Sequence, residues 1–142
     1  RNVTEAEAAV DIAIAAYESY FNEHGEHLRP VIITPYTAQV TEIKNRLRER
    51  GFPIDNESVI TAYRSQGREY PFVIVSLVRR NPARTIGFLE NEKLRAQVYV
   101  ACSRAQGKLV VLMSKETFGG KPLYEELVNV RGTRHALLWG WD

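Results

Sequence analysis

The segment VIITPYTAQV (residues 31–40) places a hydroxyl group and an aromatic ring directly after three apolar residues that read as a buried strand. Ligands of open α/β sheets bind at the carboxyl ends of strands, which is where Thr34, Pro35 and Tyr36 fall. A hydroxyl and an aromatic ring at this place could contact a sugar-phosphate backbone or stack on a base. The alternative is an ordinary strand-to-helix turn in which Thr37 caps the helix and Tyr36 is a packing residue. Taken singly, the segment favours this alternative.

The polar segment TAYRSQGRE (residues 61–69) lies between two apolar runs. Gly67 permits close approach of the backbone to a ligand, and Gln66, Arg68 and Glu69 supply donors and acceptors around it. An acidic residue in a strand-connecting loop can accept a hydrogen bond from a ribose hydroxyl, as it does in dinucleotide-binding folds. A surface loop with a turn glycine explains the same residues, so this segment alone does not define a site.

The segment VYVACSRA (residues 98–105) is an apolar helix face that ends in Arg104 just before a strand. An arginine held rigidly at such a place suits charge stabilisation on a transferring phosphoryl group. The alternative is that Arg104 only interacts with the negative carboxyl end of its own helix. The single cysteine of the chain, Cys102, lies in this apolar run, where a buried packing role is favoured over a nucleophilic one.

Apolar periodicity predicts the elements that position these segments. The chain of 142 residues is long enough for one domain with its own core, residues 1–142. Alternating apolar strands and helices predict an α/β domain, a mostly parallel sheet with helices on both faces. The expected helices cover residues 4–22, 37–50, 91–105 and 122–130, the strands cover 31–33, 58–62, 72–78 and 108–113, and a loop covers 79–89.

Composition and charge limit the class of protein. Hydrophobic residues make up 44% and charged residues 25%, which are ordinary globular values. Residues 30–110 hold thirteen basic and seven acidic residues, an excess that suits phosphate partners, although on charge alone an arginine-rich solvated surface is favoured. A single cysteine favours a reducing, intracellular compartment, cytoplasmic or nuclear. No apolar run approaches the length of a membrane span, so no membrane partner is expected. The start at Arg1 suggests a fragment of a longer protein.

Together, and in this order, the segments resemble the second RecA-like motor domain of superfamily 1B helicases. This group includes the nonsense-mediated-decay RNA helicase and its zinc-finger, NFX-type relatives. The resemblance implies a RecA-like fold of the P-loop-NTPase type. The matching positions are Asn2 with Glu5-Ala6, Ile33-Thr34-Pro35-Tyr36 with Gln39, Gln66-Gly67-Arg68-Glu69, Ser76 to Asn81, Gly87-Phe88-Leu89 and Val100 to Ala105.

The resemblance implies nucleotide-binding roles in one part of the chain. Arg104 would be the arginine finger that touches the ATP γ-phosphate from the second lobe. Gly67 and Glu69 would lie at the nucleotide cleft, and Gln66 would relay between nucleotide and nucleic acid. The chain lacks a G-x-x-x-x-G-K-(S/T) sequence. ATP and Mg²⁺ are therefore expected only in the intact protein, with a first lobe as partner, and no metal site is expected in this domain.

A second set of residues is implied in nucleic-acid binding. Thr34, Pro35, Tyr36 and Thr61 would line the path of single-stranded RNA or DNA. The resemblance thus implies the C-terminal lobe of an ATP-dependent helicase or translocase, inactive when isolated.

The alternative is a non-catalytic RecA-like scaffold, or a module that binds nucleic acid or protein partners in an RNA-processing or silencing complex. Tyr63, Ser65, Ala96 and Gln97 depart from the pattern of the family and favour this alternative. The presence of both Glu69 and Arg104 favours the enzyme.

Overall fold

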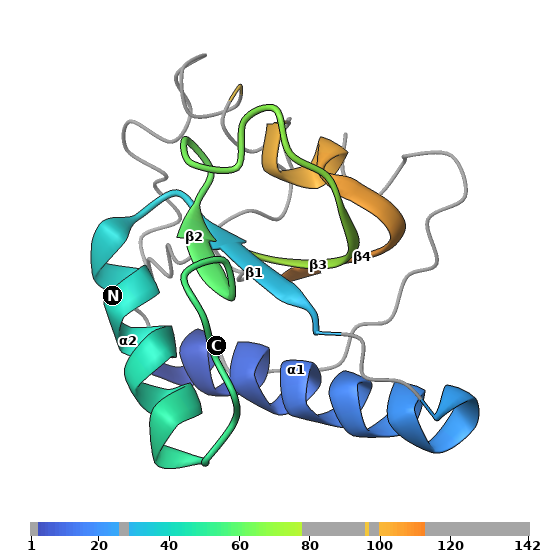
Figure 1. Cartoon of the computed structure of the whole chain (residues 1–142). Coiled ribbons are helices and arrows are strands. Elements are labelled where there is room, and N and C mark those ends of the chain that lie inside the picture. Colours follow the sequence, from blue (N-terminus) through green and yellow to red (C-terminus); the bar gives the residue numbers. More distant parts are fainter. Residues whose placement is uncertain (1–2, 26–28, 78–95, 97–99, 113–142) are drawn as a thin grey trace.

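The computed structural model describes residues 3–25, 29–77, 96 and 100–112, which form a four-stranded sheet with helices packed against it (Figure 1). The helix predicted at 122–130 and the loop predicted at 79–89 lie outside the described residues. The elements are α1 (Val3–His24), β1 (Val31–Thr34), α2 (Thr37–Glu49), β2 (Val59–Thr61), β3 (Tyr70–Ser76) and β4 (Ala105–Leu112).

The strands lie in the order β2-β1-β3-β4, and each neighbouring pair is parallel. Thr34 of β1 is in register with Thr61 of β2, so the two strands end side by side. The chain returns from β2 to β3 across β1 through residues 62–69, which we call the crossover (Figure 1). This arrangement confirms the predicted α/β fold with a parallel sheet.

Both long helices cover one face of the sheet. Four alanines of α1 are buried in the core of this face, and their small methyl side chains let the helix approach the sheet closely. The apolar stripe of α2 fills the remaining space, and the ring of Tyr17 meets Phe52 edge-on at 5.0 Å between centroids. The core of this face comprises Ala6, Ala8, Ala9, Val10, Ala13, Ile32, Val40, Ile43, Leu47, Val59, Phe72, Ile74 and Leu112.

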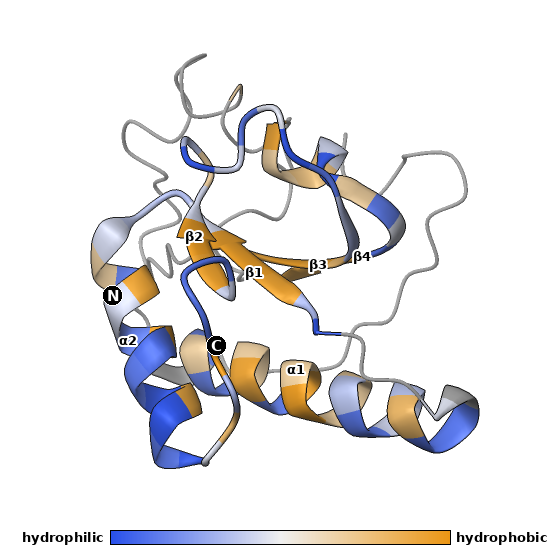
Figure 2. Ribbon diagram, in the orientation of Figure 1, coloured by the Kyte–Doolittle hydropathy of each residue, from blue (hydrophilic) through white to orange (hydrophobic). Residues whose placement is uncertain are grey.

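Among the described residues, Ala62 of the crossover and Ala101 of the helical residues 100–103 pack on the other face of the sheet. Its buried side chains alternate with those of the first face along each strand, so the central strands are apolar on both sides. The strands are accordingly among the most hydrophobic segments of the ribbon in Figure 2. The predicted reading of residues 31–33 as a strand covered on both faces is therefore confirmed. The second core comprises Val31, Ile33, Ile60, Ala62, Val73, Val75, Leu77 and Ala101.

The boundary between the third predicted helix and the last strand was wrong. Helical geometry ends at residue 103, Arg104 lies in a turn, and β4 begins at Ala105 rather than at residue 108. The cause is pairing with β3, since Ala105 lies in register with Tyr70 and the Tyr70 amide donates to the Arg104 carbonyl at 2.8 Å. The first residues of β4 are half-buried or exposed, so they lack the apolar pattern that identifies a strand in sequence.

Candidate nucleotide and nucleic-acid surfaces

Thr34 lies at the carboxyl end of β1, as predicted, but its side chain is buried. Its hydroxyl accepts a hydrogen bond from the Tyr36 amide at 3.5 Å. Its carbonyl accepts from the Ala62 amide at 3.0 Å, which fixes the start of the crossover. Thr34 therefore shapes the turn in the described conformation, and its hydroxyl does not face solvent.

Tyr36 occupies the position before the first turn of α2. Its backbone is extended, with φ −119° and ψ 128°, and its side chain forms no capping hydrogen bond. The ring is half-buried and packs against the crossover face of the sheet. The expected alternative for this segment is thus correct about Tyr36, whereas Thr37 is the first residue of α2 and not its cap. Pro35 is half-buried beside it.

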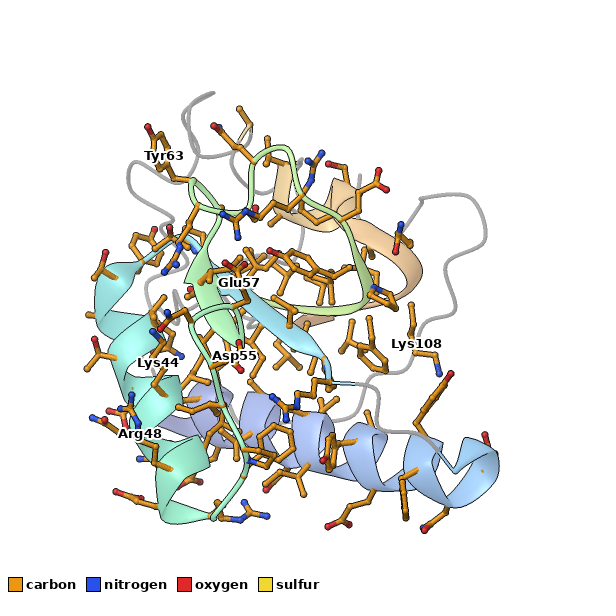
Figure 3. The ribbon with its side chains drawn as sticks, in the orientation of Figure 1. Lys44, Arg48, Asp55, Glu57, Tyr63 and Lys108 are labelled. Atoms are coloured by element: carbon orange, nitrogen blue, oxygen red, sulfur yellow. The ribbon has the colours of Figure 1, made fainter. Side chains whose placement is uncertain are left out.

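Thr61 ends β2 next to Thr34 and opens the crossover. Its hydroxyl accepts from the Arg64 amide at 3.2 Å, and its carbonyl accepts from the Ser65 amide at 3.1 Å. Tyr63 extends into solvent with 76% of its surface exposed, as Figure 3 shows. The carboxyl ends of β1 and β2 thus present a hydroxyl-bearing turn flanked by aromatic side chains.

The crossover is held from within by Ser65, one of the residues that departs from the family pattern. Ser65 is fully buried, and its hydroxyl donates to the Ala62 carbonyl at 2.7 Å. Gly67 has a φ of +76°, a conformation that favours glycine. Gln66 and Glu69 are exposed, and the Glu69 carboxylate accepts from the Gln106 amide at 3.1 Å.

Arg104 lies between the short helical stretch and β4, half-buried. Its Nε donates to the Val100 carbonyl at 3.1 Å, and its terminal nitrogen donates to the Ser103 hydroxyl at 2.8 Å. These contacts satisfy the carboxyl end of its own helix, as the alternative for this segment expected. The guanidinium uses two of its five N–H groups in them, which leaves donors for an anion.

The structure divides the predicted site residues between opposite ends of the sheet. The predicted residues Thr34, Tyr36 and Thr61 form the carboxyl-edge group. The predicted residues Glu69 and Arg104 form the amino-edge group, together with Gln106, which was not predicted and is bonded to Glu69. The two ends lie about 20 Å apart, because β3 spans six residue steps of roughly 3.3 Å each. The crossover connects them, with Gln66 and Gly67 midway. Within the amino-edge group, the Tyr70–Arg104 backbone bond joins the Q-G-R-E segment to the V-A-C-S-R-A segment.

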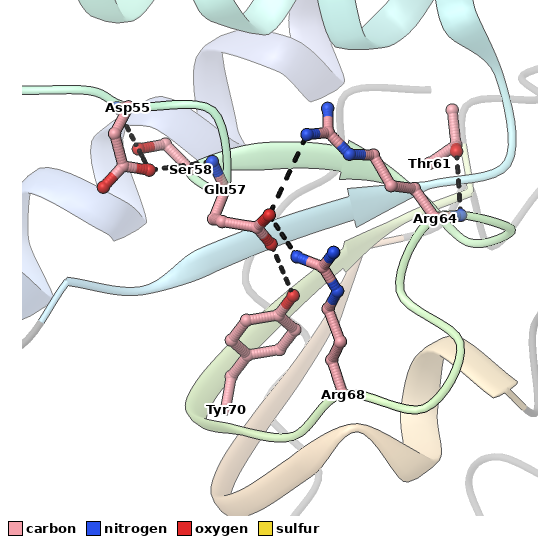
Figure 4. Close-up of polar contacts among 7 residues, drawn as sticks. All are labelled: Asp55, Glu57, Ser58, Thr61, Arg64, Arg68 and Tyr70. Carbon is pink, nitrogen blue, oxygen red and sulfur yellow. Dashed lines mark hydrogen bonds and ion pairs between the residues drawn. The ribbon is translucent and has the colours of Figure 1, made fainter.

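Glu57 is the centre of a polar cluster that sequence patterns did not reveal (Figure 4). Its carboxylate accepts a hydrogen bond from Arg68 and another from the Tyr70 hydroxyl at 2.9 Å, and it forms an ion pair with Arg64 at 3.9 Å. The bonds from Arg68 and Tyr70 lower the pKa of Glu57 below its usual value of 4.5. Burial, followed by the bond to Glu57, raises the pKa of Tyr70. Glu57 lies in a turn outside every recognised motif, so only the fold brings the cluster together.

Glu5, which the sequence analysis named only as part of the family resemblance, is a buried charged residue. It lies in the first turn of α1, and its carboxylate accepts from the hydroxyl of Ser76 at the end of β3. This bond ties the start of α1 to the carboxyl end of the sheet.

A groove of about 300 Å³ lies between α1 and α2, away from every predicted site residue. Two ion pairs cross it, Arg46 with Glu7 at 2.7 Å and Arg50 with Asp11 at 2.8 Å. Lys44 and Arg48 lie on the outer side of α2 (Figure 3). Because both arginines that line the groove are paired with carboxylates across it, we interpret it as the contact between two packed helices and not as a ligand site.

Other site chemistry is limited in the part of the chain that the structure describes. No three His, Cys, Asp or Glu side chains of these residues gather as metal ligands. None of the helices found among them is long and apolar enough to cross a membrane. Burial raises the pKa of the Cys102 thiol to about 12, so the side chain stays protonated and packs against the second core, as the sequence favoured.

A protein-family model described as "AAA domain" matches residues 1–116 of the chain. The chain is 35% identical over 104 residues to the DNA replication ATP-dependent helicase/nuclease DNA2 of Saccharomyces cerevisiae, covering 73% of this chain and 7% of that protein. It is 37% identical over 86 residues to the DNA polymerase alpha-associated DNA helicase A of Schizosaccharomyces pombe, covering 61% of this chain and 12% of that protein.

The regulator of nonsense transcripts 1 of Dictyostelium discoideum is 30% identical over 114 residues, 77% of this chain and 8% of that protein. The chain therefore spans only a small part of the length of these relatives. Among solved structures, the C-terminal domain of a possible DNA helicase from Lactobacillus plantarum WCFS1 superposes with a TM-score of 0.51 at 24% identity. The match covers 74% of this chain and 66% of that one, and it supports the fold alone.

Proposed function

The chain belongs to the AAA domain family and is a superfamily 1 helicase domain, and from this premise we propose that it is the C-terminal lobe of an ATP-dependent helicase. The observation that carries the proposal is the bond between Tyr70 and Arg104, which places the Q-G-R-E and V-A-C-S-R-A segments side by side at one end of the sheet. A nucleotide held by a first lobe against this end would meet both segments at once.

Arg104 is the arginine finger in this proposal. In the described state its guanidinium is bonded to Val100 and Ser103 at its own helix end. These are single bonds from a charged donor to neutral acceptors, and a γ-phosphate offers stronger, charge-assisted bonds in their place. Arg104 can therefore exchange partners without unfolding the sheet that positions it.

The remaining nucleotide contacts fit the exposed segment before β3. Gly67 leaves its surroundings open, with no atom within 4 Å of the place a side chain would start. Glu69 is exposed and could accept from a ribose hydroxyl, and Gln66 lies on the crossover between the two ends of the sheet. ATP and Mg²⁺ would be held mainly by the first lobe, because this chain has no phosphate-binding loop.

The carboxyl-edge group would form part of the single-strand path. Tyr36, Pro35 and Thr61 are half-buried and can present a ring edge or a hydroxyl to a sugar-phosphate backbone. Thr34 contributes by holding the turn, because its own hydroxyl is buried. The substrate would be single-stranded RNA or DNA. A nucleic-acid motor of this kind would act inside the cell, in the cytoplasm or the nucleus.

A scaffold without ATPase activity is the second candidate. It is favoured by the bonds of Arg104 to its own helix end and by the buried Ser65, which locks the crossover through Ala62. A lobe that keeps the fold but not the catalytic motion would look the same in this state. The two candidates differ in whether Arg104 ever leaves Val100 and Ser103.

The test compares this chain with the intact protein that carries both lobes. We expect no ATP turnover by the 142-residue chain alone and turnover stimulated by single-stranded RNA or DNA in the intact protein. The chain alone should bind a single-stranded oligonucleotide weakly, with an affinity that falls steeply between two salt concentrations. An intact protein without ATPase activity would establish the scaffold, and turnover by the purified chain would overturn the two-lobe assignment.

A further inference from the structure

Glu57 contacts both halves of the crossover at once, although it belongs to neither. Arg64 lies near the beginning of the crossover, Arg68 near its end, and Tyr70 is the first residue of β3. All three side chains converge on one carboxylate (Figure 4).

The backbone of Glu57 is held by the turn that leads into β2. The Glu57 amide donates to the Asp55 side chain at 2.8 Å, and the Asp55 amide donates to the Ser58 hydroxyl at 2.9 Å. The Ser58 carbonyl accepts from the amide of Ile32 in the centre of the sheet at 2.9 Å. Asp55 is also within 3.6 Å of Arg29. Glu57 is therefore fixed to the sheet by its backbone, so its side chain can act as a rigid anchor for the crossover.

Two of the three residues that Glu57 contacts are bonded to the two groups of site residues. The Arg64 amide donates to the Thr61 hydroxyl in the carboxyl-edge group. The Tyr70 amide donates to the carbonyl of Arg104 in the amino-edge group. The Glu57 carboxylate is thus linked to both ends of the sheet, through Arg64 to Thr61 and through Tyr70 to Arg104.

The three partners of Glu57 lie at different distances from its carboxylate, so a competing ligand would not displace them equally. Arg68 and the Tyr70 hydroxyl are within hydrogen-bond distance, whereas Arg64 is at 3.9 Å. The side chains of Arg64 and Arg68 are equally exposed, so a phosphate of a bound strand competes best for Arg64, the more loosely held of the two. Loss of Arg64 leaves the whole carboxylate charge to Arg68 and Tyr70, at the end of the crossover that leads to Arg104.

We propose that Glu57 is the positioning residue that couples the single-strand path to the nucleotide end of this lobe. The inference rests on the proposed function and deepens it, because it names the residue through which strand binding at Thr61 and Arg64 is communicated to Tyr70 and Arg104. Glu57 touches neither ligand, and it acts through the two arginines and the tyrosine.

The test uses the intact protein and the substitution Glu57→Gln, which keeps the shape and one acceptor oxygen but removes the charge. The control is Asp11→Asn, which also removes one carboxylate from an arginine pair, on the far side of the domain at α1. We expect Glu57→Gln to lower the ratio of strand-stimulated to unstimulated kcat by about 5-fold or more, the scale of an allosteric coupling. Asp11→Asn should leave the ratio unchanged.

Amide hydrogen exchange supplies a readout that does not depend on catalysis. In wild-type protein, addition of a single-stranded oligonucleotide should change the exchange rate of the Tyr70 amide, and Glu57→Gln should abolish this change. Should Glu57→Gln fail to fold, Tyr70→Phe removes only the hydroxyl that bonds to Glu57 and should lower the same ratio.

Failure of the coupling and failure of the proposed helicase function give different results. Full strand stimulation in Glu57→Gln and in Tyr70→Phe would overturn the coupling while leaving the helicase function intact. A wild-type protein without any strand-stimulated turnover would overturn the proposed function and the coupling with it.

Discussion

The two ends of the sheet hold their candidate site residues in different ways. In the carboxyl-edge group, Thr34 and Thr61 use their hydroxyls to accept from backbone amides, and both lie at the ends of paired strands. In the amino-edge group, Glu69 and Arg104 are held by side-chain bonds, to Gln106 and to Val100 and Ser103. The hydroxyls of the first group take part in the hydrogen bonds that form the turns, whereas the side chains of the second group do not.

This difference teaches which end can respond to a ligand. A hydroxyl that satisfies a backbone amide cannot leave without exposing a polar group, which makes the carboxyl end a preformed surface. A guanidinium bonded to one carbonyl and one hydroxyl can exchange those partners for a phosphate. We therefore expect the carboxyl end of the sheet to bind a single strand with a preformed surface. At the amino end, we expect Arg104 to change its contacts when it meets a phosphate.

The sharpest test of this contrast is Arg104→Ala in the intact protein. We expect kcat for ATP hydrolysis to fall by roughly 10³-fold or more, the scale for a lost arginine finger. Strand affinity without nucleotide should barely change, because Arg104 lies at the other end of the sheet. Lysine should rescue poorly, since an ammonium does not reproduce the planar guanidinium fork. Unchanged ATPase activity in Arg104→Ala would favour the scaffold.

Gly107→Ala tests whether the close contact between β3 and β4, beside the amino-edge group, is needed for stability. A Cβ at Gly107 would lie 2.9 Å from the Pro71 carbonyl oxygen, so β3 and β4 must move apart. We expect the free energy of unfolding to fall by about 1–3 kcal/mol, as for other overpacked sites. Gln106→Ala, an exposed neighbour on the same strand, should change it by no more than about 0.5 kcal/mol. Chemical denaturation of the 142-residue chain gives both values, and equal effects would contradict the close contact.

Tyr36→Ala should have the reverse phenotype of Arg104→Ala. In the proposed single-strand path, loss of the ring should weaken single-strand binding by about 1–3 kcal/mol, which is roughly 5- to 150-fold in Kd. Nucleotide affinity should survive. Fluorescence anisotropy with a labelled oligonucleotide measures the strand Kd, and thermal unfolding checks that the loss of the half-buried ring has not unfolded the chain. A normal strand Kd would remove Tyr36 from the path.

The smallest expected effect is the pH dependence of the stability that the Glu57 cluster contributes. The folded pKa of Glu57 is lowered by Arg68 and Tyr70, so its contribution to stability is present above pH 4.5 and is lost as the pH falls through the lower, folded value. The cluster is partly exposed, and we expect a contribution of at most about 1 kcal/mol. The stability difference between wild type and Glu57→Gln should be full at pH 7 and shrink below pH 4.5. A constant difference would mean that the charge of Glu57 is not what matters.

The sequence determined the parts of this protein that depend on local pattern. The apolar runs at residues 31–33 and 72–78 have no polar side, and such runs form strands that are covered on both faces. The helical spacing of Val40, Ile43 and Leu47 gave the buried stripe of α2 directly. The order of short motifs was enough to identify a superfamily 1 helicase domain, because each motif fixes residue types at set distances along the chain.

Only the tertiary structure decided how distant segments meet. It moved the start of β4 back to Ala105, because a strand begins where its neighbour offers hydrogen bonds and not where its own side chains become apolar. It buried Thr34 and bonded Arg104 to its own helix end, which residue types alone left open. It brought Glu57 to the crossover as well. Ion pairs between segments leave no periodic trace in a sequence, since their partners are set by strand order and not by spacing.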